Sequence, residues 1–460
     1  MSRRDGKRIV TMRPWTTRIG ALSLLIPLLC PTISFTQGDV SQDRQAGWHI
    51  RPERLQQTLG ALSTYERNAD GGVTRLGFSE ADMAARDYVM ELMRQSGLEV
   101  RVDPAGNIFG HRAGSERLPV LLFGSHIDSV LHGGNFDGDV GHLSAIEVVR
   151  SLSDAHMTTR HPLEVVIWVN EEGNHFGLGT FGSAAAAGAI GPDVLDRKDD
   201  QGKTLADWLR RYGQDPAYFA EARIARGSVA GYVELHIEQG GVLDEANVPI
   251  GIVQGIVGIK HWDCLSTGFA NHAGTTPMNR RRDALAAASR DVLALREEIR
   301  RNPGRQVATV GRMTVEPGAQ NVIPGRVEFC VDMRDLDDAK IDAICSRAQN
   351  DFGEIANEEG VTTQCALTDA IQSAKTDPAF QETIRSAARS ASLTTLDVPS
   401  GAGHNAQNVA RFAPMGMIFI PSRGGISHSA KENSSWEHIA GGAEVLYRTI
   451  LALDTQLNRN

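Results

Sequence analysis

Two segments of the chain are almost continuously apolar, and each runs into polar residues at its end. They are LPVLLFGSHID (residues 118–128) and LEVVIWVNEEG (residues 163–173). Neither alternates between apolar and polar positions, as a strand with one solvated face would. Strands buried on both faces of a mostly parallel sheet have this pattern. The segment SAIEVVRSL (144–152) between them has helical spacing. We therefore predict an α/β fold whose mostly parallel sheet is covered by helices.

Two further elements fit this prediction. Residues 79–97 predict a capped helix, with Ser79 at the N-cap, acids in the first turn and Gly97 after the last turn. Near the C-terminus, MGMIFIPS (415–422) predicts another strand that is buried on both faces.

The middle of the chain has a different pattern. From residue 251 to residue 369 it predicts strands and long helices in the order β-α-β-β-α-β, the arrangement of a small ferredoxin-like domain. The strands are predicted at 255–270, 306–318, 325–335 and 361–370, and the helices at 282–300 and 337–359. We therefore predict an inserted domain (251–369) within a larger domain made of 47–250 and 370–460.

The N-terminal segment stands apart in charge. Residues 1–37 contain six Lys or Arg residues and one acid, whereas the whole chain has a net charge of −9. The apolar run IGALSLLIPLL (19–29) has the length of the core of a signal peptide and is too short to span a bilayer. We predict a signal segment at 1–37, a periplasmic or secreted protein, and no stable membrane anchor. A cytoplasmic protein with a mis-assigned start is the alternative.

Net charge and cysteine content restrict the function further. An acidic chain without clustered Lys and Arg is not expected to bind nucleic acid. Beyond the N-terminal segment the chain has four cysteines, and none belongs to a C-x-x-C motif. We predict that they are buried free thiols: Cys264, Cys330, Cys345 and Cys365.

Acids and histidines gather where the predicted strands end, which is where open α/β sheets bind ligands. Such groups would repel one another or stay protonated unless a cation lay among them. A mixed set of His, Asp and Glu without thiolates suits zinc or manganese. Each pair of these residues alone is also typical of structural ion pairs or solvated acids. The candidates are His126, Asp128, Asp137, Glu171, Glu172, His236, Glu238 and His428.

A series of motifs gives these residues a common context. In chain order they are GSHIDSV..GGNFDGDVG, NEEGNHFG, VELHIEQG, NHAGTTPMNRRRDAL, QNVIPG, MRD, SGAGHNAQ and ISHSAKE, and the similarity extends from about Gly71 to Asp454. The chain resembles the N-carbamoyl-L-amino-acid hydrolase and allantoate amidohydrolase branch of the di-metal aminoacylase/carboxypeptidase superfamily, whose fold is zinc exopeptidase-like.

The resemblance implies a cofactor of two divalent cations, Zn²⁺ or Mn²⁺, bridged by Asp137. His126 and His236 would complete one site, and Glu172 and His428 the other.

The resemblance also implies roles for two further acids. Glu171 would be the general base on the water held between the metals, and would later give the proton to the leaving nitrogen. Adjacent acids at a strand end point differently, so Glu172 can ligate while Glu171 faces the water. Asp128 would fix the ring of His126 through its other nitrogen.

Other motifs imply the substrate site. Arg334 has the planar fork that suits a carboxylate, and His272 would stabilise the developing oxyanion from the inserted domain or from a partner subunit. Taken alone, Arg334 is more typical of an ion pair with its neighbour Asp335, and His272 of a turn. The remaining implied substrate residues are Gln239, Asn321, Gly403 and His404.

Some nearby residues are interpreted as structural. Arg280, Arg281 and Arg282 are predicted to pair with acids at a helix start. Asn405 departs from the family, which usually has an acid at this position. The amide keeps the hydrogen bonding of the acid but removes one negative charge near His404. Second-choice ligands, each predicted to be structural, are Glu238, His132, His142 and His175.

The implied reaction is hydrolysis of a ureido C–N bond beside a carboxylate. An N-carbamoyl-L-amino acid would give the L-amino acid, carbon dioxide and ammonia. Allantoate, ureidoglycolate and 3-ureidopropionate are alternative substrates because each has a carboxylate and a ureido group. A metallopeptidase and a catalytically inactive binding module are further alternatives. By the same resemblance the inserted domain would act as a lid and form a homodimer.

Overall fold

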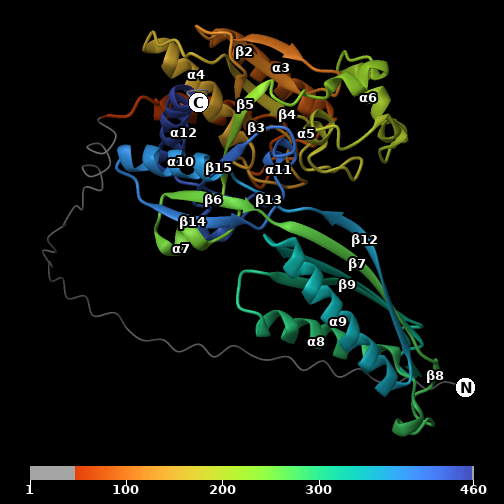
Figure 1. Ribbon diagram of the computed structural model, residues 1–460. Helices are drawn as coiled ribbons and strands as arrows, with labels where there is room; N and C mark the ends of the chain where they lie inside the picture. The colour runs from red at the N-terminus through yellow and green to blue at the C-terminus, as the bar shows by residue number, and fades with distance from the viewer. Residues whose placement is uncertain (1–46, 458–460) are drawn as a thin grey trace, which may run out of the picture. The chain divides into compact units, whose positions relative to one another are not determined.

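The computed structural model describes residues 47–457, so the segment predicted to be a signal lies outside the described residues. Within them, the main sheet has nine strands in the order β1-β2-β4-β3-β5-β15-β6-β13, with β14 also paired to β6 (Figure 1). The strands are β1 Glu99–Val102, β2 Ile108–Arg112, β3 Val120–His126, β4 Leu163–Trp168, β5 Val229–Ile237, β6 Ile250–Ile256, β13 Ala374–Lys375, β14 Thr395–Ser400 and β15 Met415–Ile420.

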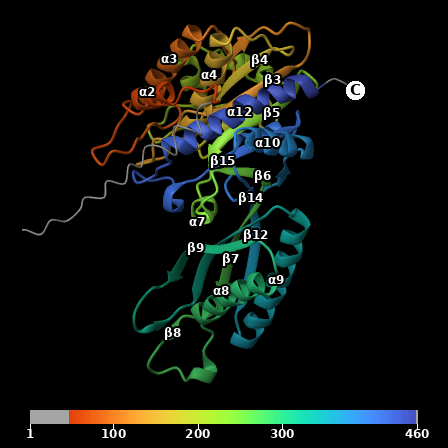
Figure 2. The same cartoon turned by 90° about the vertical axis from the view of Figure 1, so that its left-hand side faces the viewer.

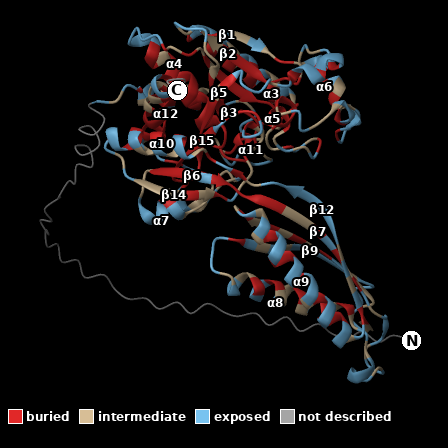
Figure 3. Cartoon of the chain, in the orientation of Figure 1, coloured by how far each residue is buried: buried red, intermediate tan, exposed pale blue. Residues whose placement is uncertain are grey.

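The central strands of this sheet are buried on both faces, as their apolar sequences predict (Figure 3). In β3, Leu121 and Phe123 pack into the core on one face, and Leu122 packs into the core on the other. The first core includes α2 Pro52–Leu62, α3 Glu80–Gln95, α4 Asp139–Asp154, α10 Pro378–Ser390 and α12 Trp436–Gln456. The second includes residues of α5 Phe181–Ala186, α7 Val242–Ala246 and α11 Asn405–Val409. A helix-covered α/β sheet is therefore confirmed.

The remaining short elements extend this lobe. The helix α6 Leu205–Arg211 packs in a satellite core beside α5. The 3₁₀ turns are η1 Pro192–Asp196, η2 Pro216–Ala222, η3 Met278–Arg280 and η4 Arg423–Gly425. The predicted cap of α3 is present, since the Ser79 hydroxyl accepts a hydrogen bond from the backbone N–H of Asp82 at 3.1 Å. No helix between residues 47 and 457 is long and apolar enough to cross a membrane.

Strand direction positions the site. The four neighbours β4, β3, β5 and β15 run parallel to one another. Their carboxyl ends therefore meet at one edge of the sheet, where β3 ends at His126 and β5 ends just beyond His236. Glu171 and Glu172 follow β4, and His428 follows β15. The sheet thus brings together side chains that are far apart in the sequence.

A second sheet forms the smaller lobe, drawn below the first in Figure 1. It has the order β12-β7-β11-β9, with β7 Gly258–Thr267, β9 Val307–Glu316, β11 Arg326–Asp335 and β12 Thr362–Ile371. Both helices, α8 Ala284–Arg301 and α9 Asp338–Glu359, pack in its core on one face, as Figure 2 also shows. The chain order is β-α-β-β-α-β, as predicted.

Two details of the small lobe differ from the prediction. The segment 250–256 forms β6 of the main sheet, so the chain enters the small sheet at β7 rather than at residue 251. The largely apolar run across this crossover, interrupted only at Gln254, hides the change of sheet. In addition, a short ribbon of β8 Asn271–His272 and β10 Val322–Ile323 extends from the small sheet at the end away from α11 and β15 (Figure 1).

The prediction of four free thiols is wrong for two of the cysteines. Cys264 and Cys365 form a disulfide between β7 and β12. Strand pairing sets these two residues opposite each other although 101 positions separate them in the sequence. Spacing along the chain could not reveal that register. Cys330 and Cys345 are free, as predicted, but only Cys345 is buried and Cys330 is half-buried.

Candidate metal centre

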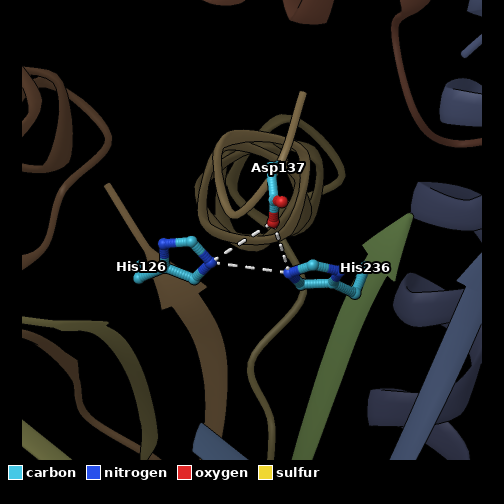
Figure 4. A group of neighbouring side chains, drawn as sticks. All are labelled: His126, Asp137 and His236. Carbon is cyan, nitrogen blue, oxygen red and sulfur yellow. Dashed lines mark hydrogen bonds and ion pairs between the residues drawn. The ribbon is translucent and has the colours of Figure 1, made fainter. Parts of the chain in front are cut away.

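Three buried side chains converge at the carboxyl edge of the main sheet. His126 projects from the end of β3, His236 from β5 and Asp137 from the turn before α4 (Figure 4). Asp137 Oδ1 lies 3.1 Å from His236 Nε2 and 3.6 Å from His126 Nε2. The two Nε2 atoms are 3.5 Å apart. Three donor atoms spaced in this way can each lie about 2 Å from one cation, the length of a Zn–N or Zn–O bond.

The outer nitrogens of both rings are fixed by backbone carbonyls. His126 Nδ1 lies 3.0 Å from the Asp128 carbonyl oxygen, and His236 Nδ1 lies 2.9 Å from the Ile237 carbonyl oxygen. A carbonyl only accepts, so each Nδ1 carries a proton and each ring turns its Nε2 toward Asp137. Each Nε2 either is protonated and donates to the carboxylate or gives its lone pair to a cation, because a bare lone pair facing a carboxylate would repel it. This donor set therefore fits a divalent cation.

A second group shares Asp137 through its other oxygen. His428 Nε2 lies 3.2 Å from Asp137 Oδ2 and 3.4 Å from Glu172 Oε1. Asp137, Glu172 and His428 therefore form another possible metal-binding group among residues 47–457. The amide of Gln239 donates from Nε2 to Asp137 Oδ2 at 2.7 Å. Because each oxygen of Asp137 faces a different group, the carboxylate can bridge two cations.

The turn beneath His126 depends on glycine. Gly138, between Asp137 and the first residue of α4, has a φ of +67°. A Cβ atom there would lie about 2.5 Å from ring atoms of His126. Any other residue would push the imidazole away from Asp137, so the glycine-rich sequence is needed for this close approach.

The carboxylates of this centre have strongly shifted pKa values. Burial together with the charges of nearby acids raises the pKa of Glu171 to about 8, although His126 acts to lower it. Burial and the charge of Asp137 also raise the pKa of Glu172 well above 4.5. For Asp137, hydrogen bonds from three histidines outweigh burial and hold the pKa well below 3.8. A buried cluster with so much negative charge needs cations or protons to balance it.

Asp128 supports the site in a different way from the one predicted. Its carboxylate accepts hydrogen bonds from the backbone N–H groups of Glu171 at 2.9 Å and Glu172 at 3.0 Å. The ring of His126 is held instead by the Asp128 backbone carbonyl, and the carboxylate lies farther away, at 3.8 Å from Nδ1. The Asp128 side chain therefore fixes the turn that carries Glu171 and Glu172. The two backbone N–H groups of this turn lie within hydrogen-bond distance of the carboxylate, and the ring of His126 does not.

Glu432 is the last residue of the ISHSAKE motif, and the sequence alone indicated no role for it. One of its oxygens accepts from the backbone N–H groups of Phe136 at 3.0 Å and Asp137 at 3.1 Å. The other accepts from the hydroxyl of Ser427 at 2.8 Å and from the N–H of His428 at 3.3 Å. Glu432 thus joins the loop of Asp137 to the loop of His428. An acid four residues after a candidate ligand was the only signal of this role.

A second buried acid, Glu234, also lies near the centre and was not singled out. It forms a third cluster with His236 and His404. Its carboxylate already accepts from the hydroxyls of Ser125 and Tyr232 and from the Ala406 N–H, at 2.9 to 3.1 Å. These bonds occupy the carboxylate, so Glu234 supports the site from beneath rather than offering a free ligand.

The metal centre opens into a cavity of about 520 Å³ between the two lobes. The large lobe supplies the candidate ligands and Glu171, together with Gln239, Gly403 and His404, and the small lobe supplies Ile259, His261, Arg334 and Ile371. His404 is buried, and its Nε2 lies 2.9 Å from the hydroxyl of Ser400. Burial and the neighbouring histidines lower its pKa well below 6.5, so it stays neutral.

Arg334 lies in this cavity, and it also forms an ion pair. Its partner is Asp332, two residues earlier on β11, and not Asp335 as the sequence alone suggested. The reason is the pleat: Asp332 and Arg334 share one face of the strand, whereas Asp335 points to the other and pairs with Lys340.

Two predicted substrate residues lie elsewhere. His272 lies in β8 and Asn321 directly precedes β10; both residues are exposed, and the Ala273 N–H donates to the Asn321 carbonyl. Neither lines the cavity formed by this chain. The structure therefore brings these two residues close to each other but not to the metal centre.

The second-choice ligands have structural contacts. Glu238 accepts from the N–H groups of Val242 and Leu243 and so caps α7. His142 donates from Nδ1 to the carbonyl of His126 at 2.7 Å. His132 is exposed and lies 3.5 Å from Asp70, and His175 lines a separate cavity.

The prediction that Arg280, Arg281 and Arg282 pair with acids is wrong. Arg281 donates to the carbonyls of Ala273 and Thr276, and no acid within residues 47–457 forms an ion pair with any of the three. The helix start is capped by Asp283 instead, and of the three arginines Arg281 is the one that holds the loop. Asn405 is fully buried at the start of α11, and neither polar atom of its side chain has a hydrogen-bond partner among the described residues.

Comparisons with known proteins agree with this site. A sequence model of peptidase family M20/M25/M40 matches residues 119–452. An N-carbamoyl-L-amino acid amidohydrolase from Geobacillus stearothermophilus is 42% identical over 88% of this chain and 99% of its own. An allantoate amidohydrolase from Bacillus subtilis (strain 168) is 35% identical over 84% of this chain and 93% of its own.

A solved structure is similar over nearly the same range. It is an amidase of the hydantoinase/carbamoylase family from Burkholderia multivorans, with a TM-score of 0.84 and 38% identity over 89% of this chain and 99% of its own. The family model, the relatives and the arrangement of the site agree, and the chain belongs to peptidase family M20/M25/M40.

Proposed function

We propose that the protein is a metal-dependent amidohydrolase that cleaves the ureido C–N bond of N-carbamoyl-L-amino acids. The observation that carries this proposal is that Asp137 belongs to two ligand groups at once. Both groups line the same cavity as Glu171 and Arg334. Relatives named N-carbamoyl-L-amino acid amidohydrolase support the substrate class. The products would be the L-amino acid, carbon dioxide and ammonia.

The cofactor in this proposal is a pair of Zn²⁺ or Mn²⁺ ions. His126 and His236 would hold one ion, Glu172 and His428 the other, and Asp137 both. When bound, the ions would polarise the scissile carbonyl and make water acidic enough to ionise near neutral pH.

The side chains of this protein have separate tasks in the reaction. Glu171 takes a proton from the attacking water and gives it to the leaving nitrogen. Asp128 holds Glu171 in place through its backbone N–H. Arg334 binds the substrate carboxylate from the opposite side of the cavity. Gln239, Gly403 and His404 border the space between these groups and would contact the rest of the substrate.

Allantoate is the second candidate substrate. It also pairs a ureido group with a carboxylate, and relatives named allantoate amidohydrolase match most of the chain. Ureidoglycolate and 3-ureidopropionate share the same chemistry. A catalytically inactive binding module is disfavoured because Glu171 and all five candidate ligands face one site.

We also propose a homodimer. His272 and Asn321 lie exposed on the ribbon of the small lobe, outside the cavity of their own chain. In a dimer of suitable geometry the ribbon of one protomer would reach the cavity of its partner, where the imidazole could donate to a developing oxyanion. A dimer by light scattering supports this proposal, and a monomer at working concentration contradicts it.

Export from the cytoplasm is a further part of the proposal. It rests on the basic and apolar pattern of residues 1–37 and on the disulfide between Cys264 and Cys365. Disulfides of this kind persist in oxidising compartments such as the periplasm. N-terminal sequencing of the protein from its native host tests this directly, because export predicts a mature chain that begins after the apolar run.

The test of the function is ammonia release from a panel of substrates. The panel contains N-carbamoyl-L-amino acids, allantoate, ureidoglycolate and 3-ureidopropionate, assayed with metal-stripped enzyme that is reloaded with Zn²⁺ or Mn²⁺. Glu171→Gln is the matched variant and is expected to lose about 10²- to 10⁴-fold in turnover. No ammonia from any substrate, with both cations bound, would overturn the proposal. Highest kcat/KM on allantoate would select the second candidate.

A further inference from the structure

The guanidinium of Arg334 is only partly occupied by its protein contacts. Its Nε and Nη2 donate side-on to the two carboxylate oxygens of Asp332, at 2.9 and 2.8 Å. Its Nη1 donates to the carbonyl of Gly401 in the large lobe at 2.9 Å. A guanidinium has five N–H groups, so one remains on Nη1 and one on Nη2. These two form the end of the fork, which is the edge left for a ligand in the cavity.

Asp332 is itself held by a row of side chains across the small sheet. Strand pairing sets His261 of β7 directly opposite Asp332 of β11, and Asp369 of β12 on the other side of His261. His261 Nε2 lies 3.1 Å from Asp332 Oδ2, and His261 Nδ1 lies 3.7 Å from Asp369 Oδ2. His261 also lines the cavity. The row therefore supports Asp332 at Oδ2, the oxygen that also accepts from Arg334 Nη2.

The charge state of this pair suits a fixed anion-binding group. Burial alone would raise the pKa of Asp332, but hydrogen bonds from Arg334 and His261 hold it below 3.8. The hydrogen bond to Asp332 in turn raises the pKa of Arg334. Both groups are consequently ionised at neutral pH, and the side-on pair fixes the plane of the guanidinium.

We propose that Asp332, supported by His261, is a positioning residue that holds Arg334 side-on so that its free Nη1–Nη2 end receives the substrate carboxylate. This inference rests on the proposed function, because it assigns a substrate contact to Arg334. It also explains how substrate orientation would be selected. Asp332 and the Gly401 carbonyl fix the plane of the guanidinium, and a substrate carboxylate can form two hydrogen bonds only when it lies in that plane. Since Gly401 belongs to the large lobe, the same contacts also set the distance between the carboxylate site and the metal centre.

The kinetic test uses Asp332→Asn with two substrates. One is N-carbamoyl-L-methionine, and the other is its carboxamide, which lacks the negative charge. The variant is expected to raise KM for the acid about 10- to 100-fold with kcat within about threefold, because a charge-assisted hydrogen bond is lost. KM for the carboxamide should not change. His261→Gln should raise KM for the acid in the same direction but less.

The matched control is Asp263→Asn, which removes an exposed acid of β7 that is paired with Arg312 at 3.3 Å. It should leave both KM values unchanged. An equal rise in KM for the acid and the carboxamide, or no rise for either, would overturn the positioning role.

A crystal structure of the Asp332→Asn variant separates this inference from the proposed function. The guanidinium of Arg334 is expected to leave the Gly401 carbonyl, whichever substrate the enzyme prefers. An unmoved Arg334 would overturn the inference even if the enzyme hydrolyses N-carbamoyl-L-amino acids. If the wild type hydrolyses none of them, the proposed function fails, and the position of Arg334 in the variant still decides the role of Asp332.

Discussion

The two lobes of the protein bury their sheets in different ways. In the main sheet, β3 is covered on both faces and Leu121 to His126 are all buried. In the small sheet, α8 and α9 cover one face only, so β11 alternates: Val331 and Met333 lie in the core, and Asp332 and Arg334 lie on the open face. A strand covered on both sides is open to a ligand only where it ends. A strand covered on one side can present polar groups along its length.

This difference assigns separate tasks to the lobes. The large lobe holds the candidate ligands and Glu171 at the ends of β3, β4, β5 and β15, in a setting fixed by buried hydrogen bonds. The small lobe supplies Arg334 from the open face of its sheet. Substitutions in the large lobe should therefore lower turnover, and substitutions in the small lobe should change substrate affinity or the stability of that lobe.

The largest effect is expected for Asp137→Asn. An amide cannot bridge two cations as a carboxylate does, so ammonia release should fall by more than about 10³-fold, since metal catalysis supplies much of the rate. Asp70→Asn, at an exposed acid near His132, is the control and should keep full activity. Substantial turnover in Asp137→Asn would break the assignment of chemistry to the large lobe.

Removal of the disulfide should affect the small lobe alone. The double variant Cys264→Ser, Cys365→Ser is expected to destabilise that lobe by about 2–5 kcal/mol, because the cross-link restricts the unfolded chain. Hydrogen exchange followed peptide by peptide measures this in each lobe. Cys330→Ser, at a free cysteine, is the control. Equal loss of protection in both lobes would show that they unfold together.

A buried acid should make the stability of the small lobe depend on pH. Asp291 of α8 is fully buried, and burial raises its pKa to about 7. The folded chain therefore keeps this proton up to about pH 7, whereas the unfolded chain releases it near pH 4, and stability falls as the pH rises through that range.

Asp291→Asn removes this dependence. Between pH 5 and pH 8 the wild type should lose about 2 kcal/mol more stability than the variant. Urea unfolding of both proteins at the two pH values measures the difference, with Asp87→Asn at an exposed acid of α3 as the control. Parallel pH profiles for wild type and Asp291→Asn would contradict the shifted pKa.

The smallest effect concerns the link between the two ligand groups. Glu432→Gln replaces one carboxylate oxygen, which accepts two hydrogen bonds, by an NH₂ group that can only donate. This loosens the loop of Asp137 or that of His428. Cation affinity, measured by competition with a chelator, should fall about tenfold. Glu437→Gln, at an exposed acid in the first turn of α12, should leave the affinity unchanged. Unchanged affinity in Glu432→Gln would mean that the loops hold their positions without it.

Much of this arrangement could be predicted from local sequence. Continuous apolar runs predicted the strands of the main sheet, and the residues after those runs included the candidate ligands, because strand ends and loops are encoded over a few positions. Contacts set by pairing between distant strands could not be predicted in this way. The Cys264–Cys365 disulfide and the pairing of Asp332 with His261 both depend on the register of the small sheet.

Side-chain direction was the other limit. The sequence indicated that Asp128 lies beside His126. It did not show whether the backbone carbonyl oxygen or the carboxylate of Asp128 would contact the ring. The sequence also showed that His272 and Asn321 belong to motifs. It could not show how far they lie from the metal centre, because that distance depends on the direction in which the ribbon of β8 and β10 projects.

The central claim is that Asp137 joins two cation sites, a deep one at His126 and His236 and an outer one at Glu172 and half-exposed His428. The most direct measurement is the number of Zn²⁺ ions per chain, by plasma mass spectrometry, in wild type and in His428→Asn after equilibration with limiting free zinc. We expect two ions in the wild type and one in the variant. A single ion in the wild type, or the same number in both proteins, would show that Asp137 does not join two cation sites.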